Sequence, residues 1–328
     1  MTDQMKSKGV PKAVLAVLLA LSSSALSPSF AIEASTAATA NGISEFSLEP
    51  DTSEHSQERK EIESLLSTIE GQWNAHNLDG VMSNYADDYI NNDGLDKKAV
   101  TELTKDFWKT YPDAKSSSKT KQIRIDGPFA TVESRDIAVG TTSKEMPGIN
   151  TKGDLNSISE GQLYIKKTGN VWKIIGDRID YEKVRVAFGL ARQLQASFSA
   201  PEQVKSGKQY SAKLELNLPT GLTAVGSITN QVLEYPQPPP TEVWRPLDGP
   251  TLERVINANG NNRNELLMAT IGITNAQRNA LMGIEFLTRR LNVVPTMEEL
   301  ADKTAVRESH NESKVSSKAE PKNEKNEK

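Results

Sequence analysis

The sequence has no cysteine and only three histidines among its 328 residues. Without cysteine the chain has no disulfide, no thiolate nucleophile and no thiolate-bound metal, so burial of a core has to stabilise it. His55, His76 and His310 lie far apart in the sequence, which disfavours a histidine-bound zinc or transition metal. The chain also lacks a glycine-rich phosphate loop. We therefore expect neither a metal nor a cofactor.

A marked excess of charge is missing too. The 39 Lys and Arg residues nearly balance 43 Asp and Glu residues, which gives a net charge of -4. No segment forms the basic stripe that a nucleic-acid-binding surface requires. This composition excludes nucleic acid as the main partner.

Long apolar runs are absent beyond the first residues. Three lysines precede an apolar run from Ala13 to Leu21, and small residues flank a cleavage point after Ala31. The run is shorter than the roughly 20 residues that span a bilayer, so it predicts a signal peptide over 1–31 that is removed. We expect export to the periplasm, the cell surface or the medium, with no membrane span after cleavage.

Both ends of the remaining chain are poor in large apolar side chains. Residues 32–56 are rich in Ser, Thr, Ala and Glu, and residues 299–328 alternate Lys, Glu, Ser and Asn. Such segments cannot bury enough apolar surface to fold. They predict a disordered leader and a disordered charged tail around two ordered blocks, 57–187 and 188–298.

The first block begins with helical periodicity and ends with strands. Apolar residues recur at i, i+3, i+4, i+7 and i+11 from Ile62 to Trp73, and further helices are predicted from Leu78 and from Asp96, a suitable N-cap. Strand patterns follow, including a hairpin from Leu163 to Arg178. Helices followed by antiparallel strands are typical of an α+β fold.

The second block, 188–298, contains short strand candidates with turns between them and no helical pattern. This spacing predicts a β-sandwich that is similar in pattern to immunoglobulin-like domains. Proline donates no backbone hydrogen bond, so the proline-rich segment Pro236 to Pro240 is predicted to form an exposed loop.

Three segments of the first block carry a family resemblance: Asn77 to Met82, Tyr85 to Tyr89, and Gly169 to Ile174. Together they resemble the NTF2-like superfamily, in particular its SnoaL-like and ketosteroid-isomerase-like branches, over about residues 57–187. The resemblance implies a cone in which three N-terminal helices pack on a curved antiparallel sheet around a pocket. The predicted architecture is therefore such a cone followed by a β-sandwich.

The resemblance also implies site residues. It puts Asp93 at the place of the isomerase base, whereas the oxyanion donors fall on Ile69 and Ile158, which cannot donate a hydrogen bond. Asn92-Asp93-Gly94 is also ordinary turn chemistry. The ligand pocket is predicted to be lined by aromatic residues and one arginine: Trp73, Tyr85, Tyr89, Trp108, Tyr164 and Arg178.

Three functions remain open. The first is a non-catalytic exported protein whose NTF2-like domain binds a small apolar ligand or forms a homodimer, while the sandwich contacts an envelope or extracellular protein. The second is a ketosteroid-isomerase-like or SnoaL-like enzyme with Asp93 as general base. The third is a dimerisation scaffold without a ligand.

Overall fold

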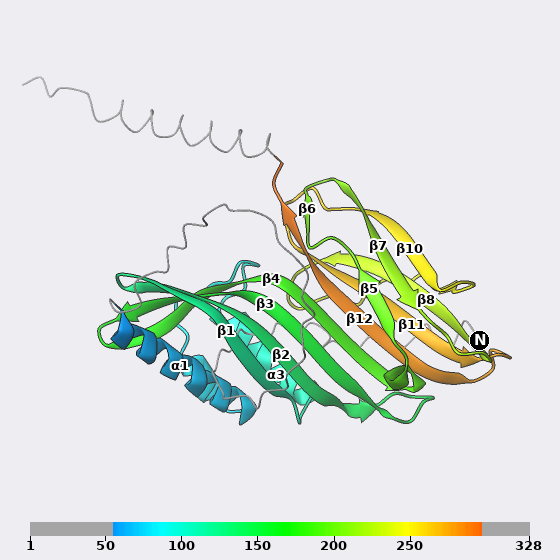
Figure 1. The fold of residues 1–328 in the computed structure, drawn as a ribbon, viewed down its shortest axis with the longest axis horizontal. Coiled ribbons are helices and arrows are strands. Elements are labelled where there is room, and N and C mark those ends of the chain that lie inside the picture. Colours follow the sequence, from blue (N-terminus) through cyan, green and yellow to red (C-terminus); the bar gives the residue numbers. More distant parts are fainter. Residues whose placement is uncertain (1–54, 297–328) are drawn as a thin grey trace, which may run out of the picture.

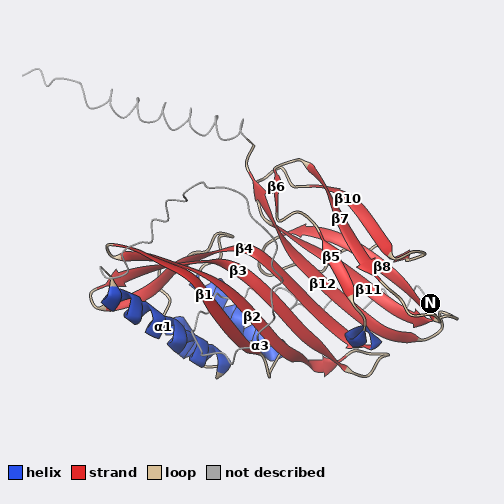
Figure 2. Cartoon of the chain, in the orientation of Figure 1, coloured by secondary structure: helices blue, strands red, loops and turns tan. Residues whose placement is uncertain are grey.

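The computed structural model describes residues 55–296. The predicted signal peptide, nearly all of the leader and the tail lie outside the described residues. Three helices come first: α1 (Ser56–Asn74), α2 (Leu78–Ser83) and α3 (Lys97–Thr110). The remaining elements are strands, apart from the short 3-10 helix η2 (Leu190–Gln193). Figure 2 shows how strongly strands predominate.

The strands follow in chain order. They are β1 (Lys115–Asp126), β2 (Phe129–Glu145), β3 (Lys152–Thr168), β4 (Val171–Gly189), β5 (Ala196–Ser199), β6 (Gln203–Lys205), β7 (Gln209–Leu216), β8 (Leu222–Val232), β9 (Arg245–Pro246), β10 (Thr251–Asn257), β11 (Glu265–Asn275) and β12 (Leu281–Val294). Nine of them form one sheet in the order β1-β2-β3-β4-β12-β11-β8-β9, with β6 beside β12. The other three form a second sheet in the order β10-β7-β5.

The predicted fold class is wrong. A cone followed by a separate sandwich requires the first sheet to end at β4, but β4 pairs with β12 in antiparallel register, from Gly283 opposite Gly189 to Arg289 opposite Lys183. One mainly antiparallel sheet therefore continues from the first block into the second (Figure 1). Helices are few and short, so the chain is a β-rich fold instead of an α+β cone with an added sandwich. The domain limits 57–187 and 188–298 stay a prediction.

Two cores lie on opposite faces of this long sheet. Val186 and Phe286 belong to the core beneath the helices, whereas their chain neighbours Ala187 and Leu287 belong to the core beneath the small sheet. Successive side chains of a strand point to opposite faces, so β4 and β12 contribute to both cores at once. Burial on both faces makes this junction the centre of the molecule.

Side-chain spacing and capping determine where the helices form. In α1, the buried residues Ile62, Leu66, Ile69 and Trp73 form one face, as their spacing predicts. The carboxylate of Asp96 accepts a 2.8 Å hydrogen bond from the backbone N–H of Ala99 and so caps α3, which confirms the predicted N-cap. Backbone hydrogen bonds hold the loop between α2 and α3 on β4, such as the bond of 2.9 Å from the N–H of Asn92 to the carbonyl oxygen of Asp177. No helix within residues 55–296 is long and apolar enough to cross a membrane.

Candidate functional site

A group of polar side chains is buried beneath the helices. Tyr85 follows α2, Asp136 lies on β2 and Asp177 lies on β4, and their exposed fractions are only 2%, 0% and 5%. Asp136 lies on the same face of β2 as Val132 and Ala130, which belong to the core beneath the helices, called here the helix-side core. Asp177 lies opposite Leu163 of the same core. Their carboxylates therefore point to the helix side of the sheet. Buried aspartates are rare and have to be compensated by hydrogen bonds.

Hydroxyl donors supply that compensation. Asp136 accepts a short hydrogen bond from the Ser118 hydroxyl, directly opposite on β1, and one of 3.0 Å from Ser134, two residues along β2. Asp177 accepts a short hydrogen bond from the Tyr89 hydroxyl. The strand register and the loop after α2 thus bring each donor to its carboxylate.

The Tyr85 hydroxyl is buried without a hydrogen-bond partner among the described residues. Burial raises the pKa of Tyr85 well above its usual value, and the negative charges of Asp177 and Asp136 raise it further. The hydroxyl is therefore neutral and able to donate. We call Tyr85, Asp136 and Asp177 the buried acid cluster.

Burial raises the pKa of Asp177 to about 6, and the charge of Asp93 adds to the increase, while the hydrogen bond from Tyr89 and the charge of Arg290 oppose it. A carboxyl group with such a pKa exchanges its proton close to neutral pH. General acids and bases work best in that range.

The structure gathers four of the predicted pocket residues in the helix-side core. The ring centroids of Trp73 and Trp108 are 5.6 Å apart, and those of Tyr85 and Tyr89 are 4.9 Å apart. The indole nitrogen of Trp108 is buried without a partner within the described chain, like the Tyr85 hydroxyl. The aromatic residues therefore pack together in this core, and two of them keep a donor without a partner among the described residues.

Two predicted pocket residues lie elsewhere. Tyr164 follows the core residue Leu163 on β3, so it points to the other face, where its hydroxyl donates to Gln162 over 3.3 Å. Arg178 pairs with Asp180 over 2.8 Å and borders a cleft outside the helix-side core. Neither residue joins the aromatic group around Tyr85.

Asp93 lies in the loop before α3 and is held by two partners. Arg290 of β12 contacts both carboxylate oxygens, over 2.8 and 2.6 Å, and Asn264 donates over 2.8 Å. Burial alone would raise the pKa of Asp93, but the bonds from Arg290 outweigh it, and the pKa lies below its usual value. A carboxylate engaged in this way is a weak proton acceptor. The turn itself is closed by the Asn91 side chain, which accepts from the Asp93 backbone N–H over 3.0 Å.

The sequence interpretation missed Asp136 and Asp177. Asp136 occupies a position of β2 that alternates with apolar core residues, so its place in the strand pattern was the available signal. Asp177 is harder to find, because the β3–β4 pairing shifts its register between Tyr164 and Ile165. A register shift changes which face a given residue occupies. No group of His, Cys, Asp and Glu within residues 55–296 has the arrangement of a metal site.

No protein-family model and no curated protein matches the sequence. Among solved structures, Bd1075 from Bdellovibrio bacteriovorus is similar over 39% of this chain, with 16% identity and a TM-score of 0.32, and this chain spans only 41% of its length. The hexachlorocyclohexane dehydrochlorinase LinA-type3 from Novosphingobium barchaimii LL02 is similar over 38% of this chain and 88% of its own, with 13% identity and a TM-score of 0.30. Each of these similarities covers less than two fifths of the chain. At these scores they say nothing about activity.

Proposed function

We propose that the protein binds a small organic molecule in the helix-side core. The expected ligand is largely apolar and carries at least one hydrogen-bond acceptor, such as a carbonyl or hydroxyl oxygen. The observation that carries this proposal is the buried hydroxyl of Tyr85, which has no hydrogen-bond partner within residues 55–296 and whose pKa is raised by burial and by the charges of Asp177 and Asp136.

The energetic argument concerns the choice of tyrosine. A buried donor without a partner costs about 1–3 kcal/mol, and a phenylalanine would fill the same space without that cost. An acceptor on a bound molecule would satisfy the Tyr85 hydroxyl, and the neighbouring aromatic rings would contact its apolar part. The same argument applies to the Trp108 indole nitrogen.

The test compares Tyr85→Phe with a matched control. The full chain is purified under mild conditions, and native mass spectrometry measures the mass that remains bound. We expect the wild type to retain a small molecule and Tyr85→Phe to retain at least about tenfold less, because it lacks the donor. Tyr164→Phe, on the other face of β3, should retain as much as the wild type.

Two results would contradict the proposal. One is a wild-type chain without any bound small molecule. The other is equal retention by Tyr85→Phe and the wild type, which would place the ligand elsewhere.

A second candidate function is acid–base catalysis on the bound molecule. It is favoured by Asp177, whose pKa of about 6 suits proton transfer near neutral pH. In this mechanism Asp177 takes or gives the proton, and the Tyr85 hydroxyl donates to the oxygen on which charge develops. Asp93 is less suited to the role of base, because Arg290 stabilises its charged form. A substrate identified by mass spectrometry should be turned over by the wild type and not by Asp177→Asn.

Export and homodimer formation belong to the same proposal. The N-terminal lysines and apolar run support export, and a partner in the envelope or outside the cell would then meet the second block. Ile137 and Val139 support a dimer contact, because both are on the outer face of β2 and are 41% and 47% exposed. Equilibrium sedimentation at micromolar concentration should show a dimer in the wild type and a monomer in Ile137→Lys. A wild-type monomer would remove the dimer from the proposal.

A further inference from the structure

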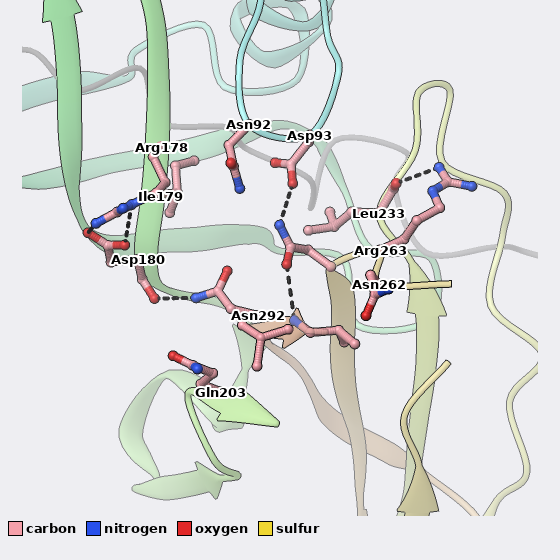
Figure 3. A pocket seen from close by; sticks show the side chains of 13 residues that line it. Asn92, Asp93, Arg178, Ile179, Asp180, Gln203, Leu233, Asn262, Arg263 and Asn292 are labelled. Carbon is pink, nitrogen blue, oxygen red and sulfur yellow. Dashed lines mark hydrogen bonds and ion pairs between the residues drawn. The ribbon is translucent and has the colours of Figure 1, made fainter. Parts of the chain in front are cut away.

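A second candidate site lies outside the helix-side core. A cleft of about 500 Å³ opens where the loop before α3, the middle of β4, strand β6, the end of β12 and the loop before β11 meet (Figure 3). None of the three residues of the buried acid cluster lines it. Its volume is in the range of small-molecule sites, about 300–1,000 Å³.

The floor of the cleft is firmly built. Asn264 donates to Asp93 and accepts from the backbone N–H of Val293 over 3.1 Å. Asn292 donates to the carbonyl oxygen of Asp180 over 2.7 Å and accepts from Arg290 over 2.8 Å. These bonds connect β4, β12 and two loops, so the shape of the cleft is present before any ligand arrives.

Other polar groups on its walls remain free. The side chains of Asn92 and Gln203 are exposed and have no hydrogen bond to any described residue, and the side-chain oxygen of Asn262 is buried without one. Figure 3 shows Asn92 and Gln203 on opposite sides of the cleft. Each amide both donates and accepts, so the two walls offer both kinds of hydrogen bond to a guest between them.

The charges of the lining cancel. Two aspartates, Asp93 and Asp180, face two arginines, Arg178 and Arg263, and two of these four form an ion pair with each other over 2.8 Å. A site for phosphate or another anion would carry a surplus of positive charge, and a site for a cation would carry a surplus of negative charge. The balance favours a neutral, polar ligand.

Apolar contact is restricted to one part of the cleft. The lining is otherwise polar and has four apolar residues: Ile179, Leu233, Val293 and Val294. A sugar ring combines many hydroxyl groups with a small C–H face, and each hydroxyl both donates and accepts. A peptide would need several apolar pockets for its side chains, and the lining is apolar in one part only. The lining therefore matches the sugar better.

We propose that this cleft binds a neutral carbohydrate, with the amides of Asn92 and Gln203 bonded to its hydroxyl groups. The site is separate from the one proposed for the helix-side core and does not depend on it.

The experiment measures binding of neutral disaccharides to the full chain by saturation-transfer NMR, with maltose, cellobiose, chitobiose and mannobiose as probes. At least one of them should bind with a Kd on the order of 1 mM or below. The double variant Asn92→Ala/Gln203→Ala should bind that probe about tenfold more weakly, because two hydrogen-bonding walls are lost.

The control is Asn261→Ala/Gln193→Ala, which removes one exposed Asn and one exposed Gln outside the cleft and should leave the Kd unchanged. Three outcomes would overturn the proposal. They are no binding of any disaccharide, equal binding by the cleft variant and the wild type, and binding of a neutral tetrapeptide in place of the sugars. Circular dichroism of each variant establishes that a lost signal is not lost folding.

Discussion

Arg290 and Asp93 form a two-point ion pair, with nitrogen–oxygen distances of 2.8 and 2.6 Å. The side chains are only 2% and 9% exposed, and they connect β12 to the loop before α3 across 197 residues of sequence. The pair thus connects the last strand in the chain, which lies in the middle of the sheet, to the loop before α3. Asp93 also lines the cleft, and the pKa of Asp177 responds to the charges of both residues.

Removal of Arg290 should be among the most damaging single changes in the chain. Arg290→Met leaves the Asp93 carboxylate buried and unpaired, which costs about 3–5 kcal/mol of unfolding free energy. Urea denaturation measures the loss. Arg178→Met is the matched control, because the pair of Arg178 and Asp180 is nearly half exposed and should contribute less than about 1 kcal/mol.

The double variant Asp93→Leu/Arg290→Met separates two explanations. If the loss comes from the stranded charge, the double variant should recover a large part of the stability that Arg290→Met loses. A double variant that is less stable than either single variant would show that the pair itself stabilises the junction.

Asp177 should make stability depend on pH in an unusual direction. Its pKa is raised in the folded protein to about 6, from an ordinary value of 3.8, so the folded state takes up this proton first as the pH falls. The contribution of this group to stability is therefore full below about pH 4 and is lost as the pH rises to about 6. The loss amounts to about 3 kcal/mol, because a difference of one between the folded and unfolded pKa values corresponds to about 1.4 kcal/mol.

Asp177→Asn removes the titrating carboxyl group, so a comparison with the wild type measures its contribution to stability. Between pH 4 and 7 the variant should gain about 3 kcal/mol of stability relative to the wild type. Urea denaturation at each pH gives the difference, in which the contributions of other carboxyl groups cancel. A constant difference across this range would mean that the Asp177 pKa is not raised.

The sequence predicted local elements better than distant pairings. The ranges of α1 and α3 follow from side chains three or four residues apart, and the turn at Gly169 joins adjacent strands. The pairing of β4 with β12 joins residues that are about 100 apart, such as Phe188 and Ile284. A periodic pattern of apolar residues does not indicate which distant strand a given strand will pair with. The continuous sheet was therefore missed, and with it the fold class.

The same limit applies to the candidate sites. Trp73, Tyr85, Tyr89 and Trp108 were recognised as aromatic residues of helices or adjoining loops, and the structure gathers them in one core. Arg290, by contrast, belongs to a strand in the second block, and its partner Asp93 belongs to a loop in the first. Only the fold brings them together. A sequence can indicate a buried carboxylate where an Asp occupies a core position in a strand pattern, as Asp136 does in β2.

The two tyrosines near the aspartates should respond in opposite ways to loss of the hydroxyl group. Tyr85→Phe removes a buried donor without a partner, so the unliganded protein should be equally stable or more stable, by up to about 1–3 kcal/mol. Tyr89→Phe removes the donor to Asp177 and should destabilise by about 1–3 kcal/mol at neutral pH. Thermal unfolding of ligand-free protein distinguishes them. Equal destabilisation by both changes would show that the Tyr85 hydroxyl has a partner in solution.

Gly161 is required by the close approach of β3 and β4. A Cβ atom at Gly161 would lie 2.3 Å from the backbone carbonyl oxygen of Arg178, at the point where the pairing of the two strands shifts its register. Backbone cannot move aside as a flexible side chain can, so Gly161→Ala should destabilise by at least about 1–3 kcal/mol. The matched control is Gly71→Ala in α1, where a Cβ meets nothing within 4 Å and should stabilise the helix by about 0.5–1 kcal/mol. Urea denaturation should therefore give changes in unfolding free energy of opposite sign for the two variants. A stabilised Gly161→Ala would mean that β3 and β4 do not approach each other so closely at this point.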